Sequence, residues 1–423
     1  QQVPELKEVN WYKMNIDGDV EMVKVPKVRF EGGKTVNFSV AANPGTTAVT
    51  QNVTEELLLD AMPDSFPTWC RKIEVLRNKA LHESTVDLVQ IDADGSVGEL
   101  NRAEDNGLVD EIKTILKSFP KLFRKDVGCV NDPKMVVTGT IYGELCTNKV
   151  KNYYSTMPEP ILKALIAKLD QEIALGVLIS VNENKIPIKN ILPVFAVEKK
   201  DGGGKPVISP VLARVVKKAP RVVANCAQGT NQATCFKAHQ ADSVQHMIRR
   251  VAPYTEKGYF CVADISSCFY SFPLAPDLWS YFVIEHPQHG MYAYSKMPMG
   301  WSVSPSHCRN FLQQILYKYH KNLARYMDDL VIFHDTREGF CRILKAVMHT
   351  LEFYDLRLSG KKMKILGRNM SVLGAQISAG QILPNPHTVQ NINEIFYLDI
   401  KNVKNMRGFV GLCAYLAKHC PYA

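Results

Sequence analysis

The chain has 423 residues, of which 46% are hydrophobic and 22% charged, and this ordinary globular composition excludes intrinsically disordered and fibrous proteins. No apolar run reaches the length of about 18 residues that crosses a bilayer, so we expect no membrane-spanning segment. The 11 cysteines form no CxxC pair, lack zinc-ligand spacing and follow no secretory signal, which predicts reduced thiols in an intracellular protein.

The net charge of +9 is unevenly distributed along the chain. Residues 1–110 hold 11 basic and 19 acidic residues, whereas residues 111–423 hold 40 basic and 23 acidic residues. A basic body favours a polyanionic partner such as nucleic acid, because Lys and Arg neutralise phosphates and release counterions. A basic enzyme without such a partner fits the charge equally well, so both interpretations stay open.

Residues 1–106 are predicted to form short strands and one short helix. The segments EMVKVPKVRF and KTVNFSV are rich in β-branched and aromatic residues, and Gly32 and Gly33 separate them as a turn. Helical sequence is expected around Cys70–Leu81.

Two amphipathic helices are predicted next. Apolar residues recur at helical spacing over residues 108–119, and Pro120 closes that segment. Pro158 and Pro160 open a second helix, which carries an apolar stripe and ends just before Gly176.

A strand pair is predicted from residue 190 onward. The segments ILPVFAVEKK and RVVANC have strand composition, and Asp201-Gly202 between them is typical of a hairpin turn. The expected tip is basic, with Lys199, Lys200 and Lys205, which by itself is also typical of any solvated turn.

Three carboxylates follow or interrupt apolar strands. Asp264 lies at the end of the strand in YFCVADISSCFYSFPL, whereas Asp328 and Asp329 lie between the apolar runs of ARYMDDLVIF, where a hairpin turn is expected. Burying such acids without partners is costly. Mg²⁺ prefers carboxylate oxygens, and two ions about 4 Å apart stabilise the attacking and leaving oxygens of a phosphoryl transfer. The three acids therefore predict a two-metal site, with an ordinary polar turn as the alternative for the adjacent pair.

The order of the motifs resembles the catalytic core of reverse transcriptases, and more narrowly that of Ty3/gypsy-type LTR retrotransposons and of retroviruses. The YMDD segment between apolar runs carries this resemblance, and seven further segments follow the family order over roughly residues 107–423. They are PEPILKALIAKLDQEIALGVL, FAVEKKDG, PRVVANC, MPMGWSVSPSHCRNFL, LRLSGKKMKIL, VLGAQIS and NVKNMRGFVGLCAYLAKHCP.

The resemblance implies four catalytic residues, Asp264, Asp328, Asp329 and Lys362, and one further metal ligand, Ile265. Asp264, Asp328 and Asp329 would bind the metal ions together with the backbone carbonyl of Ile265. Lys362 would protonate the departing pyrophosphate as a general acid.

The resemblance also implies sites for the nucleotide and for nucleic acid. Fingertip cations would clamp the triphosphate, and an aromatic gate would collide with a 2′-hydroxyl and so exclude ribonucleotides. The implied nucleotide-binding residues are Lys199, Lys200, Arg221, Phe269, Met299 and Gly300. The implied primer–template contacts are Tyr326, Met327, Trp301, Leu373 and Gly374.

The sequence departs from the family pattern in the fingers. The family usually has Gln or Phe at the position of Met299, and Ala224 replaces an acidic residue. Lys200 and Arg221 are also further apart than usual, which predicts an extended hairpin or an inserted loop.

The implied fold is α/β (α+β), a right-hand polymerase with an additional N-terminal region. The expected parts are an acidic β-rich region of unknown role at 1–106, fingers at 107–258, a palm with an antiparallel sheet at 259–376 and a partial thumb at 377–423. No ribonuclease H domain is expected after the thumb, and without an Asp-Thr-Gly or Asp-Ser-Gly triplet no retropepsin site is expected.

The implied function is an RNA-directed and DNA-directed DNA polymerase that extends a primer with dNTPs and two Mg²⁺ ions, with Mn²⁺ as a substitute. The expected partners are a template–primer duplex, with homodimerisation or a separate ribonuclease H as further alternatives, and no membrane. The expected location is the cytoplasm, with virus-like particles or the nucleus as alternatives. A domesticated binding or assembly protein without catalysis is the rival interpretation. An RNA-dependent RNA polymerase is a third, which Phe269 disfavours.

Overall fold

The computed structural model describes residues 9–14, 20–25, 36–38, 51–53, 65–91, 107–142, 154–197, 221–227, 229–235, 244–366, 369–372, 375–378, 381–384 and 403–417. By packing, the chain divides into two compact units, Gln1–Lys79 and Ala80–Ala423.

The first unit holds two antiparallel strand pairs and most of one helix. β1 pairs with β2, and β3 pairs with β4. The bounds are Val9–Met14, Val20–Val25, Val36–Phe38 and Gln51–Val53, and the predicted helix is α2, Phe66–His82. β2 thus pairs with the strand before it, and the predicted turn at Gly32 and Gly33 lies outside the described residues.

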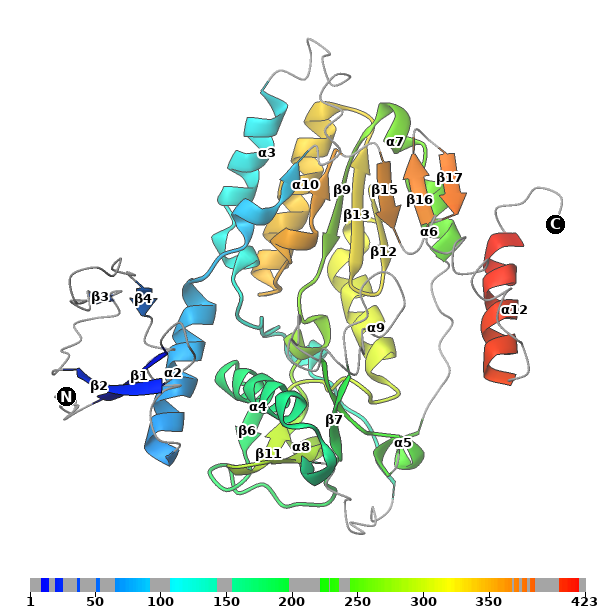
Figure 1. The fold of residues 1–423 in the computed structure, drawn as a ribbon. Coiled ribbons are helices and arrows are strands. Elements are labelled where there is room, and N and C mark those ends of the chain that lie inside the picture. Colours follow the sequence, from blue (N-terminus) through cyan, green and yellow to red (C-terminus); the bar gives the residue numbers. More distant parts are fainter. Residues whose placement is uncertain are drawn as a thin grey trace. The chain divides into compact units, whose positions relative to one another are not determined.

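A five-stranded sheet lies in the second unit (Figure 1). Its strand order is β12-β13-β9-β14-β5, with bounds Leu323–Tyr326, Asp329–His334, Tyr259–Asp264, Lys364–Ile365 and Gln90–Ile91. Neighbouring strands are antiparallel except β14 and β5, which are parallel. A two-residue turn, Met327-Asp328, joins β12 to β13, which confirms the predicted hairpin around the adjacent acids.

Strands β9 and β13 are buried on both faces, which explains their continuous apolar sequence. Successive residues of a strand point to opposite faces. α6 (Val244–Val251) packs on the face that carries Phe260 and Phe333, whereas Leu330 and Ile332, which point the other way, are also fully buried. α10 (Arg337–Phe353) packs against β13 and β9, and α3 (Leu108–Lys117) packs on α10 (Figure 1).

A second sheet of three strands is preceded by the predicted second helix. The order is β10-β11-β6, with bounds Val283–His286, Gly290–Tyr294 and Leu178–Ser180. The helix is α4, Glu159–Ala174, with Pro158 at its N-cap and Gly176 beyond its end at a left-handed φ of 68°. α3 and α4 confirm the two helices predicted from apolar spacing.

The strand pair predicted from residue 190 onward is β7 with β8, which are antiparallel. Their bounds are Val194–Val197 and Arg221–Ala224, and the chain between them lies outside the described residues. Near the C-terminus, β15, β16 and β17 form a separate antiparallel sheet, with bounds Asn369–Val372, Ala375–Ser378 and Gln381–Pro384.

The remaining described helices are α5 (Thr230–Ala233), α7 (Tyr254–Lys257), α8 (Pro276–Trp279), α9 (Ser304–Leu316) and α12 (Val403–Ala417), besides short 3-10 turns. None of the helices in the described part of the chain combines the length and the apolarity that crossing a membrane requires.

The boundary expected at residue 106 does not coincide with the end of the first unit. β5 belongs to the central sheet of the second unit. The amide of Thr85 also donates to the carbonyl of Phe123 at 2.7 Å, and that of Gln90 donates to Met363 at 3.1 Å. These backbone hydrogen bonds attach residues 85–91 to the central sheet and its surroundings, which the polar local sequence did not indicate.

Gly360 lies where two chain segments approach closely. Its amide donates to Thr85 Oγ1 at 3.1 Å, and a Cβ added to it would lie 1.8 Å from the Thr85 carbonyl oxygen. We therefore expect Gly360→Ala to lower the free energy of unfolding by about 2–3 kcal/mol, because the backbone must shift. Denaturant unfolding measures the change.

The matched control is Gly408→Ala on α12, where an added Cβ meets nothing within 4 Å. This exposed helical glycine should gain about 0.5–1 kcal/mol on replacement by alanine. Wild-type stability of Gly360→Ala would contradict the close approach to Thr85.

Glu172 of α4 is a buried carboxyl group in the core between α4 and the chain after β9. It is 2% exposed, its Oε1 accepts from the Tyr270 hydroxyl at 3.4 Å, and among the described residues its Oε2 has no hydrogen-bond partner. Burial raises the pKa of Glu172 to about 7, against the opposing effects of Lys168 and Tyr270.

A raised pKa means that the folded protein holds this proton more tightly than the unfolded chain does. Its stabilising effect is complete below the ordinary value of 4.5 and is lost as the pH rises to about 7. The unfolding free energy of Glu172→Gln minus that of wild type should therefore be about 2 kcal/mol larger at pH 8 than at pH 5. Denaturant unfolding at both pH values tests this, with the exposed Glu183→Gln as control. The same difference in unfolding free energy between variant and wild type at both pH values would contradict the effect of burial on the pKa of Glu172.

Candidate active site

Asp264 and Asp329 lie directly opposite each other on β9 and β13. Asp264 is the last residue of β9, Asp329 is the first of β13, and Asp328 lies in the turn just before it. Opposite residues of an antiparallel pair place their side chains on one face, with Cβ atoms about 5 Å apart. The fold thus brings together the three acids that the sequence singled out.

The three carboxylates repel one another. Burial, and then the charges of Asp328 and Asp264, raise the pKa of Asp329 to about 6. Burial also raises the pKa of Asp264, although the hydrogen bond and charge of Lys362 oppose this. Like charges directly opposite in a sheet are destabilising, so the cluster favours a positive counter-charge.

Lys362 supplies one such charge. Its Nζ donates to both carboxylate oxygens of Asp264, at 2.8 and 2.9 Å, while its side chain stays 64% exposed. Lys362 ends the 3-10 turn Gly360–Lys362. Ser359, the residue just before this turn, donates its amide to the Asp264 carbonyl at 3.0 Å. Lys362 therefore lies in direct contact with the acidic cluster.

The acidic cluster fits a divalent cation in donor type and in charge. Its carboxylates are hard oxygen donors, and burial, followed by the charges of neighbouring acids, raises the pKa of both Asp264 and Asp329, so a cation there would stabilise their charged forms. Within the described ranges, no three His, Cys, Asp or Glu side chains surround one point closely enough to hold an ion. Lys362 donates to both oxygens of Asp264, and each of these oxygens keeps a second lone pair that a cation could use.

Two strained residues flank the acids. Met327 and Ser267 have φ of 52° each, the left-handed region that costs a non-glycine residue about 1–3 kcal/mol. The amide of Ile265 donates to the Asp328 carbonyl at 2.9 Å, and its side chain is buried. This hydrogen bond ties the end of β9 to the hairpin turn, so the acids are held by backbone.

Phe269 lies on the 3-10 turn Cys268–Ser271 that follows the strained Ser267. Its neighbours Cys268 and Tyr270 are buried, whereas Phe269 is only half-buried. The ring therefore lies on the accessible side of this turn, five residues beyond Asp264.

Gly300 lies against the strand β8. It is exposed, has φ of 98°, and an added Cβ would lie 2.8 Å from the Ala224 carbonyl oxygen. Asn231 of α5 donates to the Gly300 carbonyl at 3.0 Å and accepts from the Ser302 amide at 2.8 Å. Asn231 thus supports the predicted base-binding turn, and no sequence motif around it indicated this role.

Trp301 corrects one expectation. Its side chain is 1% exposed, its indole nitrogen donates to Thr234 Oγ1 at 2.9 Å, and its ring packs on Phe282. A buried indole cannot contact primer or template, because its whole surface faces protein. Trp301 instead anchors the turn to the protein interior through its contacts with Thr234 and Phe282.

The other predicted contacts are partly accessible or lie outside the described residues. Met299, Tyr326 and Met327 are half-buried, and Tyr326 packs against the core under α6. The backbone of Arg221 begins β8. Outside the described residues are Lys199, Lys200, Leu373 and Gly374.

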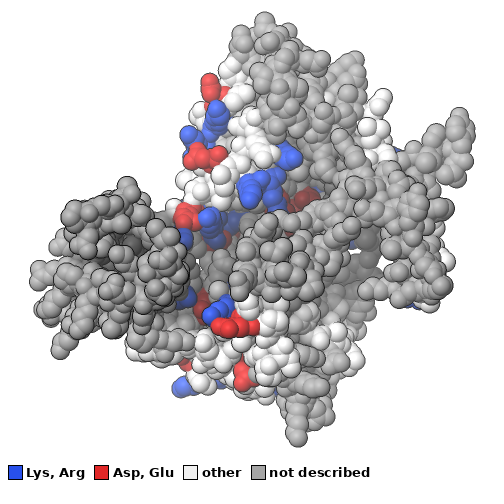
Figure 2. Space-filling model, in the orientation of Figure 1, with Lys and Arg blue, Asp and Glu red and all other residues white. Residues whose placement is uncertain are grey.

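The surface charge of the described residues is mixed. On the face in Figure 2, blue Lys and Arg side chains and red Asp and Glu side chains lie interspersed. Net charge by itself therefore does not mark where nucleic acid would bind on this face.

Comparison with protein families and with viral polyproteins identifies the central part of the chain. The family model for reverse transcriptase (RNA-dependent DNA polymerase) matches residues 197–377. A putative enzymatic polyprotein of Cassava vein mosaic virus is 29% identical over 170 residues, covering 39% of this chain and 25% of the polyprotein. The enzymatic polyprotein of Figwort mosaic virus is 25% identical over 201 residues, covering 48% and 29%. The chain thus spans about a quarter of the length of these relatives.

Solved structures share the fold. A foamy viral protease-reverse transcriptase in complex with an RNA/DNA hybrid superposes with a TM-score of 0.57 at 16% identity, covering 80% of this chain and 39% of that one. A dRH form of the foamy viral protein with double-stranded DNA has the same TM-score and identity, covering 97% and 63%. These likenesses confirm the expected α+β polymerase fold. Residues 197–377 of this chain thus match the reverse transcriptase family model, and the chain is similar to viral enzymatic polyproteins over the lengths given above.

Proposed function

We propose that this chain is an RNA-directed DNA polymerase that also copies DNA, extending a primer 3′-hydroxyl with dNTPs. The observation that carries the proposal is the group of Asp264, Asp328 and Asp329 at adjoining strand ends within a reverse transcriptase domain. A protein that only binds nucleic acid would gain nothing from three clustered negative charges beside phosphates.

Magnesium is the proposed cofactor. Asp264, Asp328 and Asp329, with the carbonyl of Ile265, would hold two ions, and Mn²⁺ would substitute. When bound, the ions would stabilise the attacking and leaving oxygens of the transfer. Lys362 Nζ lies 2.8 Å from Asp264 Oδ1, and its charge lowers the repulsion described above.

The chain's side chains would bind and select the nucleotide. Fingertip cations would hold the triphosphate, Met299 and Gly300 would support the base, and Phe269 would exclude a 2′-hydroxyl. The primer hydroxyl would lose its proton to solvent as its oxygen bonds to the α-phosphate. The bond from the α-phosphorus to pyrophosphate would break, and the ammonium of Lys362 would give the departing pyrophosphate oxygen a proton. The proposed fingertip cations are Lys199, Lys200 and Arg221.

The proposed partner is a template–primer duplex. The similar foamy viral structures are complexes with an RNA/DNA hybrid and with double-stranded DNA, which supports duplex binding by the same fold. We propose replication of a retroelement as the biological context, of the Ty3/gypsy or retroviral type, in the cytoplasm. Homodimerisation or a separate ribonuclease H would complete such a system.

Primer extension on poly(rA) with Mg²⁺ tests the activity directly. Asp328→Asn should lower the extension rate at least about 100-fold, because one charge of the metal site is lost while the side chain keeps its shape. The control Asp335→Asn changes an exposed acid just beyond β13 and should keep wild-type rate. Duplex binding by wild type without any extension would support the rival binding protein instead.

Nucleotide selection tests the gate. Phe269→Val should reduce the preference for dNTP over rNTP about 10- to 100-fold, because the smaller side chain removes the clash with the 2′-hydroxyl. Single-nucleotide incorporation with matched dNTP and rNTP measures the ratio. Phe353→Val, at an exposed phenylalanine that ends α10, should leave the ratio unchanged. An unchanged ratio in Phe269→Val would discredit the gate, and a wild-type preference for rNTP would favour an RNA polymerase.

A further inference from the structure

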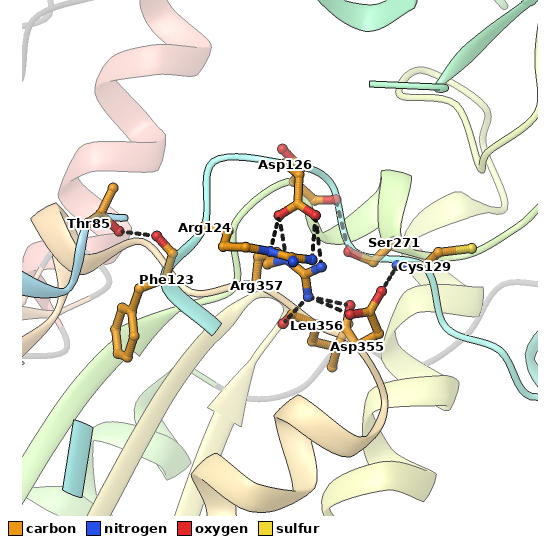
Figure 3. Close-up of polar contacts among 10 residues, drawn as sticks. Thr85, Phe123, Arg124, Asp126, Cys129, Ser271, Asp355, Leu356 and Arg357 are labelled. Atoms are coloured by element: carbon orange, nitrogen blue, oxygen red, sulfur yellow. Dashed lines mark hydrogen bonds and ion pairs between the residues drawn. The ribbon is translucent and has the colours of Figure 1, made fainter. Parts of the chain in front are cut away.

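Arg357 is a buried arginine that joins two distant chain segments (Figure 3). It is 1% exposed, and its guanidinium makes a bidentate pair with Asp126, Nε to Oδ1 at 2.6 Å and Nη2 to Oδ2 at 2.9 Å. Its Nη1 donates to Asp355 Oδ1 at 2.7 Å. Arg124 also donates to both oxygens of Asp126, Nε to Oδ1 at 3.3 Å and Nη2 to Oδ2 at 2.8 Å.

The positive charges of Arg357 and Arg124 stabilise the ionised form of Asp126. Burial alone would raise the pKa of Asp126, but the hydrogen bonds and charges of Arg357 and Arg124 hold that pKa below its ordinary value. A fork of five donors satisfies two carboxylates at once, which a lysine cannot do. Burying both charges costs hydration free energy, so a buried ion pair is weak evidence for stability by itself. We therefore look for a role of this pair in positioning the chain segments that it joins.

The main chain at Arg357 contacts the strand that carries the first acid. The carbonyl of Arg357 accepts from the Ser266 amide at 2.8 Å, and the Ser359 amide donates to the Asp264 carbonyl at 3.0 Å. These two hydrogen bonds form an antiparallel bridge in which Leu358 faces Ile265. The guanidinium of Arg357 therefore anchors the backbone that borders Asp264 on the side away from Asp329.

The turn before Arg357 depends on the same guanidinium. Asp355 has a left-handed φ of 53°, and Arg357 Nη1 donates to its carbonyl at 3.2 Å as well as to its side chain. A non-glycine residue in this region is strained. The contacts of Arg357 with Asp355 thus hold the turn that precedes the bridge between Leu358 and Ile265.

The Asp126 side of the pair reaches the gate. After Asp126 the chain passes against the same turn: the Cys129 amide donates to Asp355 Oδ2 at 3.0 Å, and a Cβ on Gly128 would lie 1.9 Å from the Asp355 carbonyl oxygen. The Val130 amide then donates to the Ser271 carbonyl at 2.8 Å. Ser271 ends the 3-10 turn that carries Phe269.

We propose that Arg357 and Asp126 are positioning residues that set the backbone of Asp264 and of the Phe269 turn relative to each other. This inference rests on the proposed polymerase function. One ion pair thereby couples the place where the cation would bind to the place where the sugar would be selected, without either side chain touching substrate.

The test measures nucleotide selection and cation affinity in full-length variants. Asp126→Asn removes one charge, and Asp126→Glu keeps the charge but lengthens the clamp by one methylene. The ratio of kcat/KM for dNTP to kcat/KM for rNTP does not depend on the fraction of folded enzyme, so a merely structural role leaves it unchanged. Binding of Mn²⁺, followed by electron paramagnetic resonance, provides a readout without turnover.

We expect both variants to lower kcat at least about 10-fold and to reduce the dNTP/rNTP ratio at least about 5-fold, with Mn²⁺ binding weakened several-fold. Because Asp126→Asn leaves Arg357 buried beside Arg124, Asp126→Glu provides the result if the first variant does not fold. The matched control is Glu111→Gln, at the Arg337–Glu111 pair that joins α3 to α10 at 3.0 Å, and it should leave all three values unchanged.

The outcomes separate the two proposals. If wild type extends primers and a folded Asp126 variant keeps the wild-type ratio and Mn²⁺ affinity, the positioning role is wrong. If wild type does not extend primers, the proposed function fails, and weakened Mn²⁺ binding in the Asp126 variants alone would still support the coupling to Asp264.

Discussion

The pairing of β9 with β13 is the constraint on which the rest of the candidate site depends. It places Asp264 opposite Asp329, while Phe260 lies opposite Phe333 at the other end of the same face. A slip of one residue would turn every side chain of a strand to the other face. The apolar contacts with α6 therefore hold two like charges side by side, against their mutual repulsion.

The neighbouring chain segments manage this repulsion and fix its geometry. Lys362 neutralises part of the charge, and the hydrogen bond from Ile265 to the Asp328 carbonyl locks the hairpin turn to the strand end. The bridge between Ile265 and Leu358 supports the opposite edge. Most of these contacts are made by backbone groups, so the arrangement tolerates wide sequence change, consistent with a shared fold at 16% identity.

Local pattern was sufficient for many elements and failed where a contact joins distant residues. The helices α3 and α4, the strand β9 and the turn between β12 and β13 follow from apolar spacing, prolines and the adjacent acids. The burial of Trp301 was missed, because a tryptophan in a glycine-containing turn has the same local sequence whether it faces solvent or core. The attachment of β5 to the central sheet was missed because its partner, β14, is far away in sequence.

The sequence alone determined the identity and order of the candidate groups: three acids, a lysine and an aromatic residue, in an order that resembles that of reverse transcriptases. It did not determine their mutual placement, because this depends on pairings between segments whose separation no local pattern encodes. Asp126 and Arg357 are the clearest case, since each is an ordinary charged residue in sequence, and 231 positions separate them. Only folding removes both from water and brings them together, with Arg124 and Asp355, as partners for buried charge.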